Sequence, residues 1–249
     1  MNFIDPNTVP TWRISFYLAM EEYVARYIYN GIDCFFTWQV SPTVICGRNQ
    51  VIENEVNLDY CREHDIRVCR RKSGGGCVYS DPGNIMLSFI TGEDNIKETF
   101  DRYLALFTRA LNRMGIPAVR NDHNDVMLNG QKISGNAIWH TQGRTIAHGT
   151  LLYDVNMDNI TKAITPPRKK LQKNGVQSVR QRITTLKGIT DLSLTDIMKG
   201  FRNEICDRTI TLDRQAVETI KQMESEYPDL RYIDFTASEK SPMRMAVEN

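Results

Sequence analysis

Three short β-type segments within residues 124–153 are the feature that most constrains the fold. Residues 126–128 are apolar, and the Asn129-Gly130 dipeptide that follows favours the two-residue turn of a β-hairpin. A second strand is predicted at 132–139, and a Gln-Gly-Arg turn leads into a third at 146–153. The pattern therefore predicts an antiparallel meander, with every strand of ordinary length.

Lys132 stands near the start of the second of these strands, and Ser134-Gly135 follows closely. The ammonium group is then held on a strand rather than on a loose loop, and Gly135 lets another group approach the backbone. A site built in this way suits a phosphate, a carboxylate or both. Position alone leaves a second interpretation open, in which Lys132 is an ordinary exposed strand lysine.

A second notable stretch, RRKSGGGCVYSDPGN, occupies residues 70–84 between strands predicted at 66–70 and 85–91. Glycines can adopt positive φ and expose their amides, while arginine can hold an oxyanion through two parallel hydrogen bonds. The stretch is no Walker loop, because no Gly-Lys-Ser/Thr follows, and no dinucleotide fingerprint, because a strand follows. Its residues indicate an anion site, and the alternative is a flexible turn beside a solvated charge cluster.

Composition limits the classes of protein to consider. A chain of 249 residues with 41% hydrophobic content can bury the core of one α/β domain. Its net charge of +1 gives no general attraction to nucleic acid or to a membrane. No apolar run reaches bilayer length, and the first residues lack the features of a signal peptide. The six cysteines match neither a CxxC pair nor a disulfide scaffold, so we expect reduced thiols and a cytoplasmic protein.

The remaining chain alternates between helical and β-type patterns. Strands are expected at 33–40 and 43–46. Because only Ser41-Pro42 separates the two strands, the pair is interpreted as a hairpin. Apolar spacing and capping residues predict helices at 13–30, 58–64, 100–114, 156–164, 193–206 and 213–227.

Three motifs carry a resemblance to a known family. RRKSGGGCVYSDPGN resembles the arginine–glycine motif of the lipoate–protein ligase A family, usually RRxSGGGxVxHDxGN. NDVMLNGQKISGNA resembles that family's KISG motif. HGTLLYDV, followed by PPRKKLQKNGVQSVRQRITTL, resembles its adenylate-binding segment. The motifs occur in family order, and the match covers roughly residues 10 to 205.

The resemblance implies a fold and a domain arrangement. The fold is α/β (α+β), a two-sheet catalytic domain of the biotin/lipoate ligase kind, related to class II aminoacyl-tRNA synthetases. The catalytic domain is expected at 1–190. Residues 191–249 are expected to form a short helical extension packed on the same domain, without the separate C-terminal accessory domain of full-length ligases. A separate accessory-domain protein is therefore a candidate partner.

The resemblance also implies a two-step reaction. The lipoate carboxylate attacks the α-phosphorus of ATP to give lipoyl-AMP and pyrophosphate, and a lysine of an acceptor protein then displaces AMP. ATP, Mg²⁺ and lipoate are the implied cofactors and substrate. The implied acceptors are lipoyl domains of 2-oxoacid dehydrogenases and the glycine-cleavage carrier, with no nucleic-acid or membrane partner.

Residue roles follow from the same resemblance. Lys132 would be catalytic, holding the carboxylate and the α-phosphate together. Asp125, with Asn124, would orient Mg²⁺ or the adenylate, although Asp125 could instead only cap a turn. The other implied substrate- and nucleotide-binding residues lie in the two motifs and the third meander strand: Arg70, Ser73, Gly74, Gly75, Gly76, Tyr79, Asn84, Ser134, Gly135, Ala137, Gly149 and Thr150.

Further expectations concern the walls of this site. The apolar wall for the acyl chain is predicted from Val44, Tyr79, Leu87 and Ala137. His148 is interpreted as a hydrogen-bonded core histidine. The basic segment 168–182 is expected to be a mobile lid, with a solvated loop as the alternative. Ser80 stands where the family motif has histidine, which predicts a different wall and acyl preference.

The alternative activity is a lipoyl or octanoyl transferase that acts on a preformed adenylate or on a carrier-bound acyl group. The thioester form of that chemistry needs a nucleophilic cysteine. No cysteine lies between Trp139 and Cys206, which leaves Cys77, beside the glycine run, as the candidate. A biotin ligase fits less well, because the glycine–arginine loop of biotin ligases reads GRGRxG and the corresponding stretch of this chain does not. A non-catalytic lipoate-binding protein has no support from a chain that carries both Lys132 and Asp125.

Overall fold

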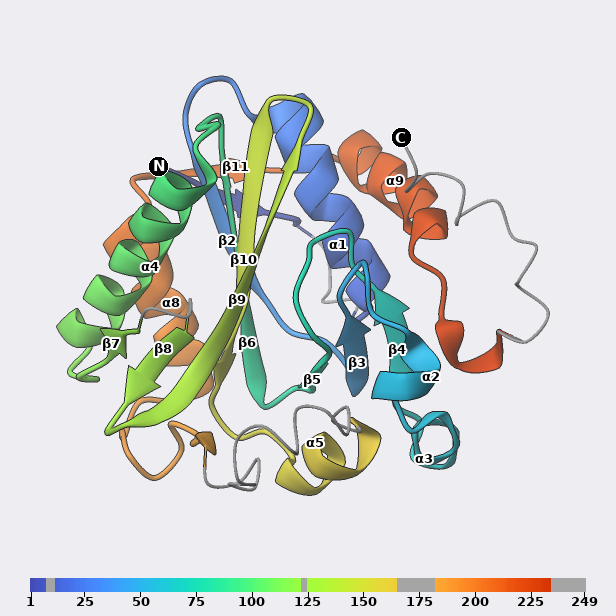
Figure 1. Cartoon of the computed structure of the whole chain (residues 1–249). Coiled ribbons are helices and arrows are strands. Elements are labelled where there is room, and N and C mark those ends of the chain that lie inside the picture. Colours follow the sequence, from blue (N-terminus) through green and yellow to red (C-terminus); the bar gives the residue numbers. More distant parts are fainter. Residues whose placement is uncertain (8–11, 122–124, 165–181, 234–249) are drawn as a thin grey trace.

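The computed structural model describes residues 1–7, 12–121, 125–164 and 182–233. Over these ranges the chain folds into one eight-stranded mixed sheet and one three-stranded sheet, with helices packed around them (Figure 1). This arrangement confirms the two-sheet α/β class expected from the sequence.

The larger sheet joins strands from the start of the chain to one near its described end. Its strands are β1 (Asn2–Asp5), β2 (Cys34–Trp38), β6 (Asn84–Thr91), β7 (Val119–Arg120), β8 (Asp125–Leu128), β9 (Gln131–Thr141), β10 (Arg144–Leu152) and β11 (Arg208–Thr211). They are arranged in the order β11-β1-β2-β6-β10-β9-β8-β7. The pairs β11–β1 and β1–β2 are parallel, and the other pairs are antiparallel.

The predicted meander is confirmed as β8, β9 and β10. Asn129 and Gly130 have φ of 50° and 79°, the two positive values that a type I′ hairpin turn requires. The β9–β10 turn repeats this geometry at Gln142 (49°) and Gly143 (67°). A register shift in the β8–β9 ladder at Val126/Met127 lies beside the strand position of Lys132.

The smaller sheet consists of β3 (Thr43–Cys46), β4 (Arg67–Arg70) and β5 (Val78–Ser80), in the order β4-β3-β5. The predicted hairpin between residues 33–40 and 43–46 is wrong, because β2 lies in the large sheet and β3 in the small one. Both strands are buried almost throughout. A strand that is apolar on both faces needs packing partners on both sides, which one tight hairpin could not supply.

The helices agree closely with the sequence pattern. They are α1 (Ile14–Tyr23), continued by a π-helical turn (Val24–Ile28), then α2 (Ile52–Glu55), α3 (Leu58–Glu63), α4 (Ile96–Arg113), α5 (Met157–Ala163), α8 (Leu194–Ile205) and α9 (Arg214–Met223). Short 3-10 segments η2 (Glu224–Glu226) and η3 (Leu230–Tyr232) follow. Ser193 forms a complete capping box, and Asp213 caps α9 as predicted.

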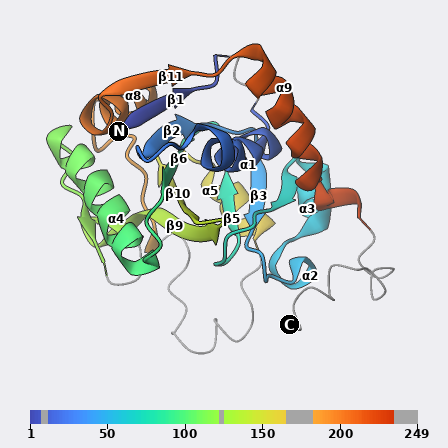
Figure 2. The ribbon, with the colours of Figure 1, turned by 90° about the horizontal axis from the view of Figure 1, so that it is seen from above.

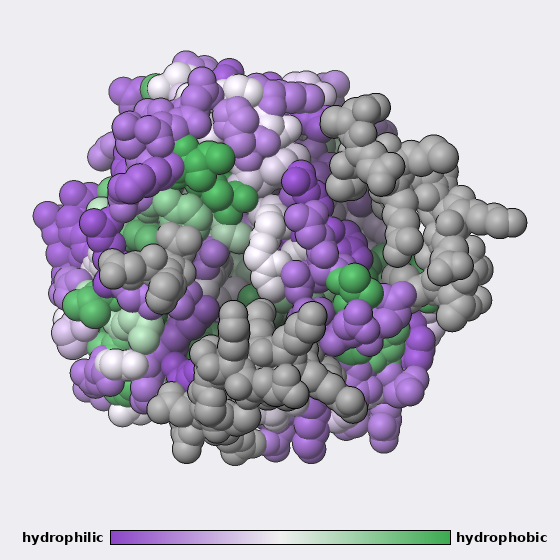
Figure 3. All heavy atoms as spheres, in the orientation of Figure 1, coloured by the Kyte–Doolittle hydropathy of each residue, from purple (hydrophilic) through white to green (hydrophobic). Residues whose placement is uncertain are grey.

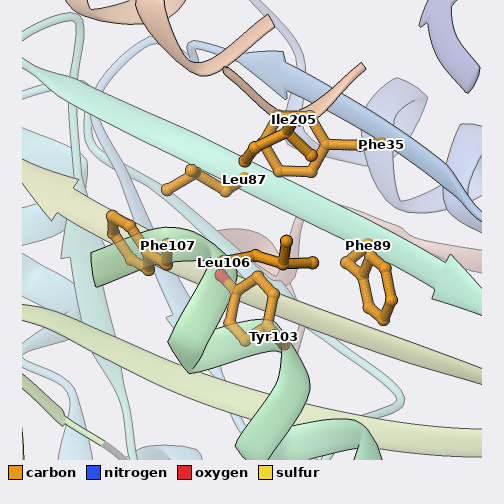
Figure 4. Close-up of a pocket in the computed structure, with 7 residues that line it drawn as sticks. All are labelled: Phe35, Leu87, Phe89, Tyr103, Leu106, Phe107 and Ile205. Atoms are coloured by element: carbon orange, nitrogen blue, oxygen red, sulfur yellow. The ribbon is translucent and has the colours of Figure 1, made fainter. Parts of the chain in front are cut away.

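Three hydrophobic clusters hold these layers together. The helices α1 and α9 cover one face of the large sheet, and α4 and α8 cover the other (Figure 2). A third cluster fills the space between the small sheet, α2, α3 and α5. In the second cluster, side chains of β2 and β6 meet those of α4 and Ile205 around a gap that has no volume open to water (Figure 4). That gap belongs to the packed core.

Hydrophilic side chains cover most of the described surface on the face shown in Figure 3. Within the described ranges, every helix is too short or too polar to cross a bilayer.

Residues beyond 190 contribute to the same core as the earlier ones. The strand β11, which the sequence pattern did not predict, extends the large sheet beside β1. The fully buried Phe201 of α8 lies 5.3 Å from Phe107 and 6.4 Å from Phe35, measured between ring centroids. The segment 194–223 thus closes both faces of the sheet in the described structure.

Replacing Phe201 by alanine tests this contribution. We expect Phe201→Ala to lower the free energy of unfolding by about 3–5 kcal/mol, because it leaves a cavity between two aromatic rings. Urea unfolding followed by far-UV circular dichroism measures the change. Ile189→Ala, at a side chain 46% exposed, is the control and should change stability by less than about 0.5 kcal/mol. A Phe201→Ala loss no larger than that of the control would contradict the shared core.

Candidate functional site

A cavity of about 220 Å³ lies where α1, the large sheet and the small sheet meet. One part of its lining, which carries the charged and polar side chains, comes from the meander and from the glycine run that follows β4: Arg71, Gly75, Gly76, Cys77, Asp125, Lys132, Gly135, Asn136, Ala137, His148, Gly149 and Thr150. Its apolar lining comes from α1, β2, β3, β5 and β6: Ile14, Leu18, Trp38, Ile45, Val78 and Met86. The fold therefore brings together the two sequence stretches that suggested an anion site.

Lys132 and Asp125 form an ion pair in the wall of this cavity. The Lys132 Nζ lies 2.8 Å from Asp125 Oδ1, and the two side chains are 36% and 21% exposed. The ion pair is therefore open to solvent and to a ligand. Gly135 makes room for the lysine, since a Cβ at this position would stand 3.0 Å from Nζ. A cation held in this way can contact an anionic ligand without leaving its strand.

The buried guanidinium of Arg71 holds the glycine loop, residues 73–77. It donates to the carbonyls of Gly74 (2.7 Å) and Gly76 (2.9 Å) and to the Ser73 hydroxyl (2.9 Å). A fourth hydrogen bond, of 2.9 Å, reaches the Ile45 carbonyl in β3. Burial lowers the pKa of Arg71. These bonds engage the carbonyl side of the loop and tie it to the small sheet.

Gly47 packs directly against the backbone of the glycine loop. A Cβ on Gly47 would stand 1.9 Å from the Gly75 carbonyl oxygen, so only glycine allows this approach. Sequence reasoning missed Gly47, Asn136 and most of the apolar lining, and it assigned the binding role to Arg70 rather than to Arg71. Gly47 lies outside the recognised motifs, and its need for a missing Cβ arises from a neighbour 28 positions away in the chain.

Arg70 stabilises a neighbouring loop and does not itself line the cavity. Its Nη1 donates to the carbonyls of Gly47, Arg48 and Gln50 at 3.1, 3.0 and 2.8 Å, and it does not line the cavity. Of the two adjacent arginines, Arg71 therefore faces the cavity while Arg70 fixes the loop at 47–50.

Tyr79 and Asn84 also lie away from the cavity lining. The Tyr79 hydroxyl accepts a hydrogen bond from Asn159, and its ring packs in the cluster behind the small sheet. Burial raises the pKa of Tyr79. The Asn84 amide donates to the Tyr79 carbonyl over 3.3 Å at the start of β6.

A buried polar chain connects the glycine loop to α1 and β10. The Ser73 hydroxyl lies 2.6 Å from His148 Nε2, and His148 Nδ1 lies 2.9 Å from Glu21 Oε2. Glu21 also accepts from Ser88, which in turn accepts from the Trp38 indole. His148 is thus hydrogen-bonded at both ring nitrogens, as predicted for a core histidine, and it also faces the cavity.

Asn136 organises the nucleotide-side residues predicted from the meander. Its Oδ1 accepts from the hydroxyls of Tyr103 (3.1 Å) and Ser134 (3.3 Å). An added Cβ on Gly149 would lie 1.9 Å from the same oxygen, so this glycine accommodates the asparagine. Gly135, Ala137, Gly149 and Thr150 line the cavity as expected, whereas Ser134 is buried behind it.

The apolar wall differs from the prediction by one strand position. Val44 and Tyr79 pack behind the small sheet and Leu87 faces α4, while their neighbours Ile45, Val78 and Met86 line the cavity. Successive strand residues point to opposite faces, so a shift by one position reverses the assignment. Ala137 was placed correctly. Ser80 bears on the wall indirectly, since its hydroxyl donates to the Met86 sulfur at 3.2 Å.

Two predicted features lie outside the described residues, namely Asn124 and the basic segment 168–182 apart from Arg182. Within the described ranges, no group of three or more His, Cys, Asp or Glu side chains could hold a metal ion. Mg²⁺ is commonly held by one or two carboxylates together with substrate phosphates. Asp125, which lines the cavity beside Lys132, fits that requirement.

Replacing Gly47 by alanine tests the support of the glycine loop. We expect a loss of about 1–3 kcal/mol in unfolding free energy, because the new methyl overlaps the Gly75 carbonyl and displaces the loop. Chemical unfolding measures the loss, and hydrogen exchange at 73–77 should become faster. Val51→Ala, in the same segment at a side chain 54% exposed, is the control and should leave both unchanged. Equal behaviour of the two variants would refute the contact.

Comparison with known proteins places the chain in a family. The sequence profile of the lipoyl protein ligase A/B catalytic domain matches residues 13–206. Over 196 residues the chain is 35% identical to the lipoate-protein ligase LplJ of Bacillus subtilis (strain 168), covering 78% of this chain and 59% of that protein. The chain therefore spans less than two thirds of this relative.

Solved structures share the fold. A bi-partite lipoate protein ligase from Thermoplasma acidophilum superposes with a TM-score of 0.76 at 24% identity, over 90% of this chain and 92% of that one. A lipoate-protein ligase A bound with ATP gives 0.75 at 22% identity, over 90% and 94%. The profile match over most of the chain, together with the sequence identity, shows that the chain belongs to the lipoyl protein ligase A/B catalytic-domain family.

Proposed function

We propose that this chain is an ATP-dependent lipoate–protein ligase, which forms lipoyl-AMP and transfers the lipoyl group to a lysine of an acceptor domain. The observation that carries the proposal is the Lys132–Asp125 ion pair at the wall of a cavity whose other side is apolar. A substrate with a carboxylate at one end and a hydrocarbon chain at the other matches both parts of this lining. Family membership and the curated relative support the same activity.

Lys132 would act at the reacting centre. The lipoate carboxylate and the α-phosphate of ATP are both anions, so their approach needs a cation between them. In the first step a carboxylate oxygen attacks the α-phosphorus and pyrophosphate leaves. In the second step the acceptor lysine amine attacks the acyl carbon and AMP leaves. The ammonium group would stabilise charge on the α-phosphate in both steps.

The apolar wall would receive the acyl chain. Trp38, Ile45 and Met86 offer a surface without charge, and α1 adds Ile14 and Leu18. Burying the chain there would hold the carboxylate at a fixed distance from Lys132. Binding energy from the unreactive part of the substrate would in this way help to orient the reacting atoms.

The glycine loop and β10 would hold the nucleotide. Gly75 and Gly76 carry no side chain that could obstruct a phosphate, and Arg71 and His148 fix Ser73 beside them. Gly149 and Thr150 line the same cavity from β10. Asp125 would hold Mg²⁺, which neutralises phosphate charge when it is bound.

The acceptor is proposed to be a lipoyl domain of a 2-oxoacid dehydrogenase or the glycine-cleavage carrier. The solved archaeal ligase of this fold is described together with its E2 lipoyl domain. That ligase is also described as bi-partite, and a separate accessory-domain protein is therefore proposed as a second partner of this chain.

One observation favours the transferase as a second candidate. Cys77 lines the cavity, and the pKa of its thiol is lowered. A transferase that uses Cys77 would form an acyl-thioester with this residue before transfer. Incubation with an octanoyl carrier protein, followed by mass analysis, separates the two: the ligase leaves Cys77 unmodified, and the transferase leaves an acyl group that hydroxylamine removes.

Replacing Lys132 by alanine tests the central role. We expect Lys132→Ala to slow lipoate-dependent pyrophosphate release by at least about 100-fold, because the charge developing on the α-phosphate loses its cation. Lys187→Ala is the matched control, since Lys187 also pairs with an aspartate, Asp154, but lies outside the cavity. An unchanged rate in Lys132→Ala, or an equal loss in Lys187→Ala, would remove the proposed role.

The proposed function is tested on the purified chain with lipoate and Mg-ATP. Pyrophosphate release followed by labelling of an added lipoyl domain would establish a ligase that acts alone. Labelling only from synthetic lipoyl-AMP would restrict the chain to the transfer step and require a partner for adenylation. Failure of both reactions would overturn the ligase and leave the cysteine-dependent transferase.

A further inference from the structure

Two cysteines lie opposite each other where the small sheet meets the glycine loop. The antiparallel register of β3 and β5 pairs Val44 with Tyr79 and Ile45 with Val78, so the next opposed positions are Cys46 and Cys77. Opposed residues in such a ladder have Cα atoms about 4.5–5.5 Å apart, within the range of about 4.4–6.8 Å that a disulfide spans. Cys46 belongs to the cluster behind the small sheet and Cys77 packs against it, so the two side chains lie on the same face.

The two thiols differ in accessibility and in acidity. Cys46 is fully buried, whereas Cys77 is half-buried and lines the cavity. The hydrogen bond from Cys46 lowers the pKa of Cys77, and the Arg71 and Arg70 guanidiniums lower it further. The same contact, together with burial, raises the pKa of Cys46. An accessible thiol of lowered pKa beside a second cysteine is the arrangement of thiols that react reversibly with disulfides.

The other cysteines lack this combination. Burial raises the pKa of Cys34, Cys69 and Cys206 to about 12 and that of Cys61 to about 11. Cys77 is therefore the one cysteine that combines access to the cavity with a lowered pKa, the two properties that favour reaction of a thiol.

We propose that Cys46 and Cys77 are a redox modification site, in which a small-molecule disulfide converts the pair into an internal disulfide that holds the glycine loop against β3. The Cys77 thiolate attacks one sulfur of the small disulfide and expels a first thiolate. Cys46, on losing its proton to solvent, attacks the Cys77 sulfur and expels the second. Two protein thiols are oxidised, one small disulfide is reduced to two thiols, and no other reactant is needed.

The position of the bond gives it a consequence for the site. Cys77 directly follows Gly76, whose carbonyl accepts a hydrogen bond from Arg71, so a bond at Cys77 would add a covalent tether at the end of the loop. The cavity of about 220 Å³ is small beside ordinary ligand sites of about 300–1,000 Å³. An acyl-adenylate would need more room than this, and a covalent bond at Cys77 would oppose any outward displacement of the loop from its path in the structure. This part of the inference rests on the proposed function.

The reduced full-length chain is treated with oxidised glutathione, the probe for the small disulfide. We expect a loss of two hydrogens in mass, a peptide that joins positions 46 and 77, and slower hydrogen exchange at 73–77. The rate of lipoate-dependent pyrophosphate release should fall by at least about 10-fold. Dithiothreitol should reverse all four changes.

Variants make the assignment specific. Cys46→Ala removes a thiol that does not line the cavity. The reduced variant should keep its pyrophosphate-release activity. After treatment with oxidised glutathione, the variant should carry glutathione on Cys77. Cys206→Ala, which removes a cysteine elsewhere, should respond like the unaltered chain. A glutathione adduct on the unaltered chain without a 46–77 bond would overturn the site.

If the 46–77 disulfide forms but changes neither the hydrogen exchange of residues 73–77 nor the rate of pyrophosphate release, the proposed effect of the disulfide on the loop is wrong. The exchange and mass measurements do not depend on turnover. A reduced chain without pyrophosphate release would therefore refute the proposed function and leave the disulfide measurable by itself.

Discussion

The hydrogen bonds of the buried Arg71 guanidinium are the interaction on which the site depends. One side chain joins β3, Ser73 and two carbonyls of the glycine loop, so the loop has a fixed path although it contains three consecutive glycines. A buried cation is costly unless its donors are satisfied, and four hydrogen bonds meet that requirement here. Without them, residues 73–77 would retain the backbone freedom that glycine confers.

The helix α1 holds the other side of the same loop through two adjacent carboxylates. Glu21 contacts His148, which holds Ser73, while Glu22 forms ion pairs with Lys72 and Arg26. Tyr227 donates to Glu22, and Lys72 also pairs with Glu226. The segment after α9 is thereby connected to the loop that borders the cavity. One network of hydrogen bonds and ion pairs therefore joins the segment after α9, the helix α1 and the glycine loop.

Much of the architecture was predictable because local signals agreed with the final fold. Asn129-Gly130 specified a hairpin, Ser193 and Asp213 specified helix starts, and the motif residues identified the fold family. The hairpin assigned to 33–46 failed, because short apolar strands carry no mark of the sheet to which they belong. The strand β11 also escaped detection, since its pairing partner β1 is 206 positions away in register.

For the site, the sequence by itself determined the types of residue: Lys132, Asp125 and the glycine run lie around one cavity, as their motifs implied. Only the tertiary structure decided which neighbour of each residue faces the cavity. It selected Arg71 over Arg70 and Ile45 over Val44, and it required glycine at position 47. The reason is geometric. Chemical type is a property of the residue, whereas the face that a strand presents and the room that a Cβ requires are fixed by segments distant in the chain.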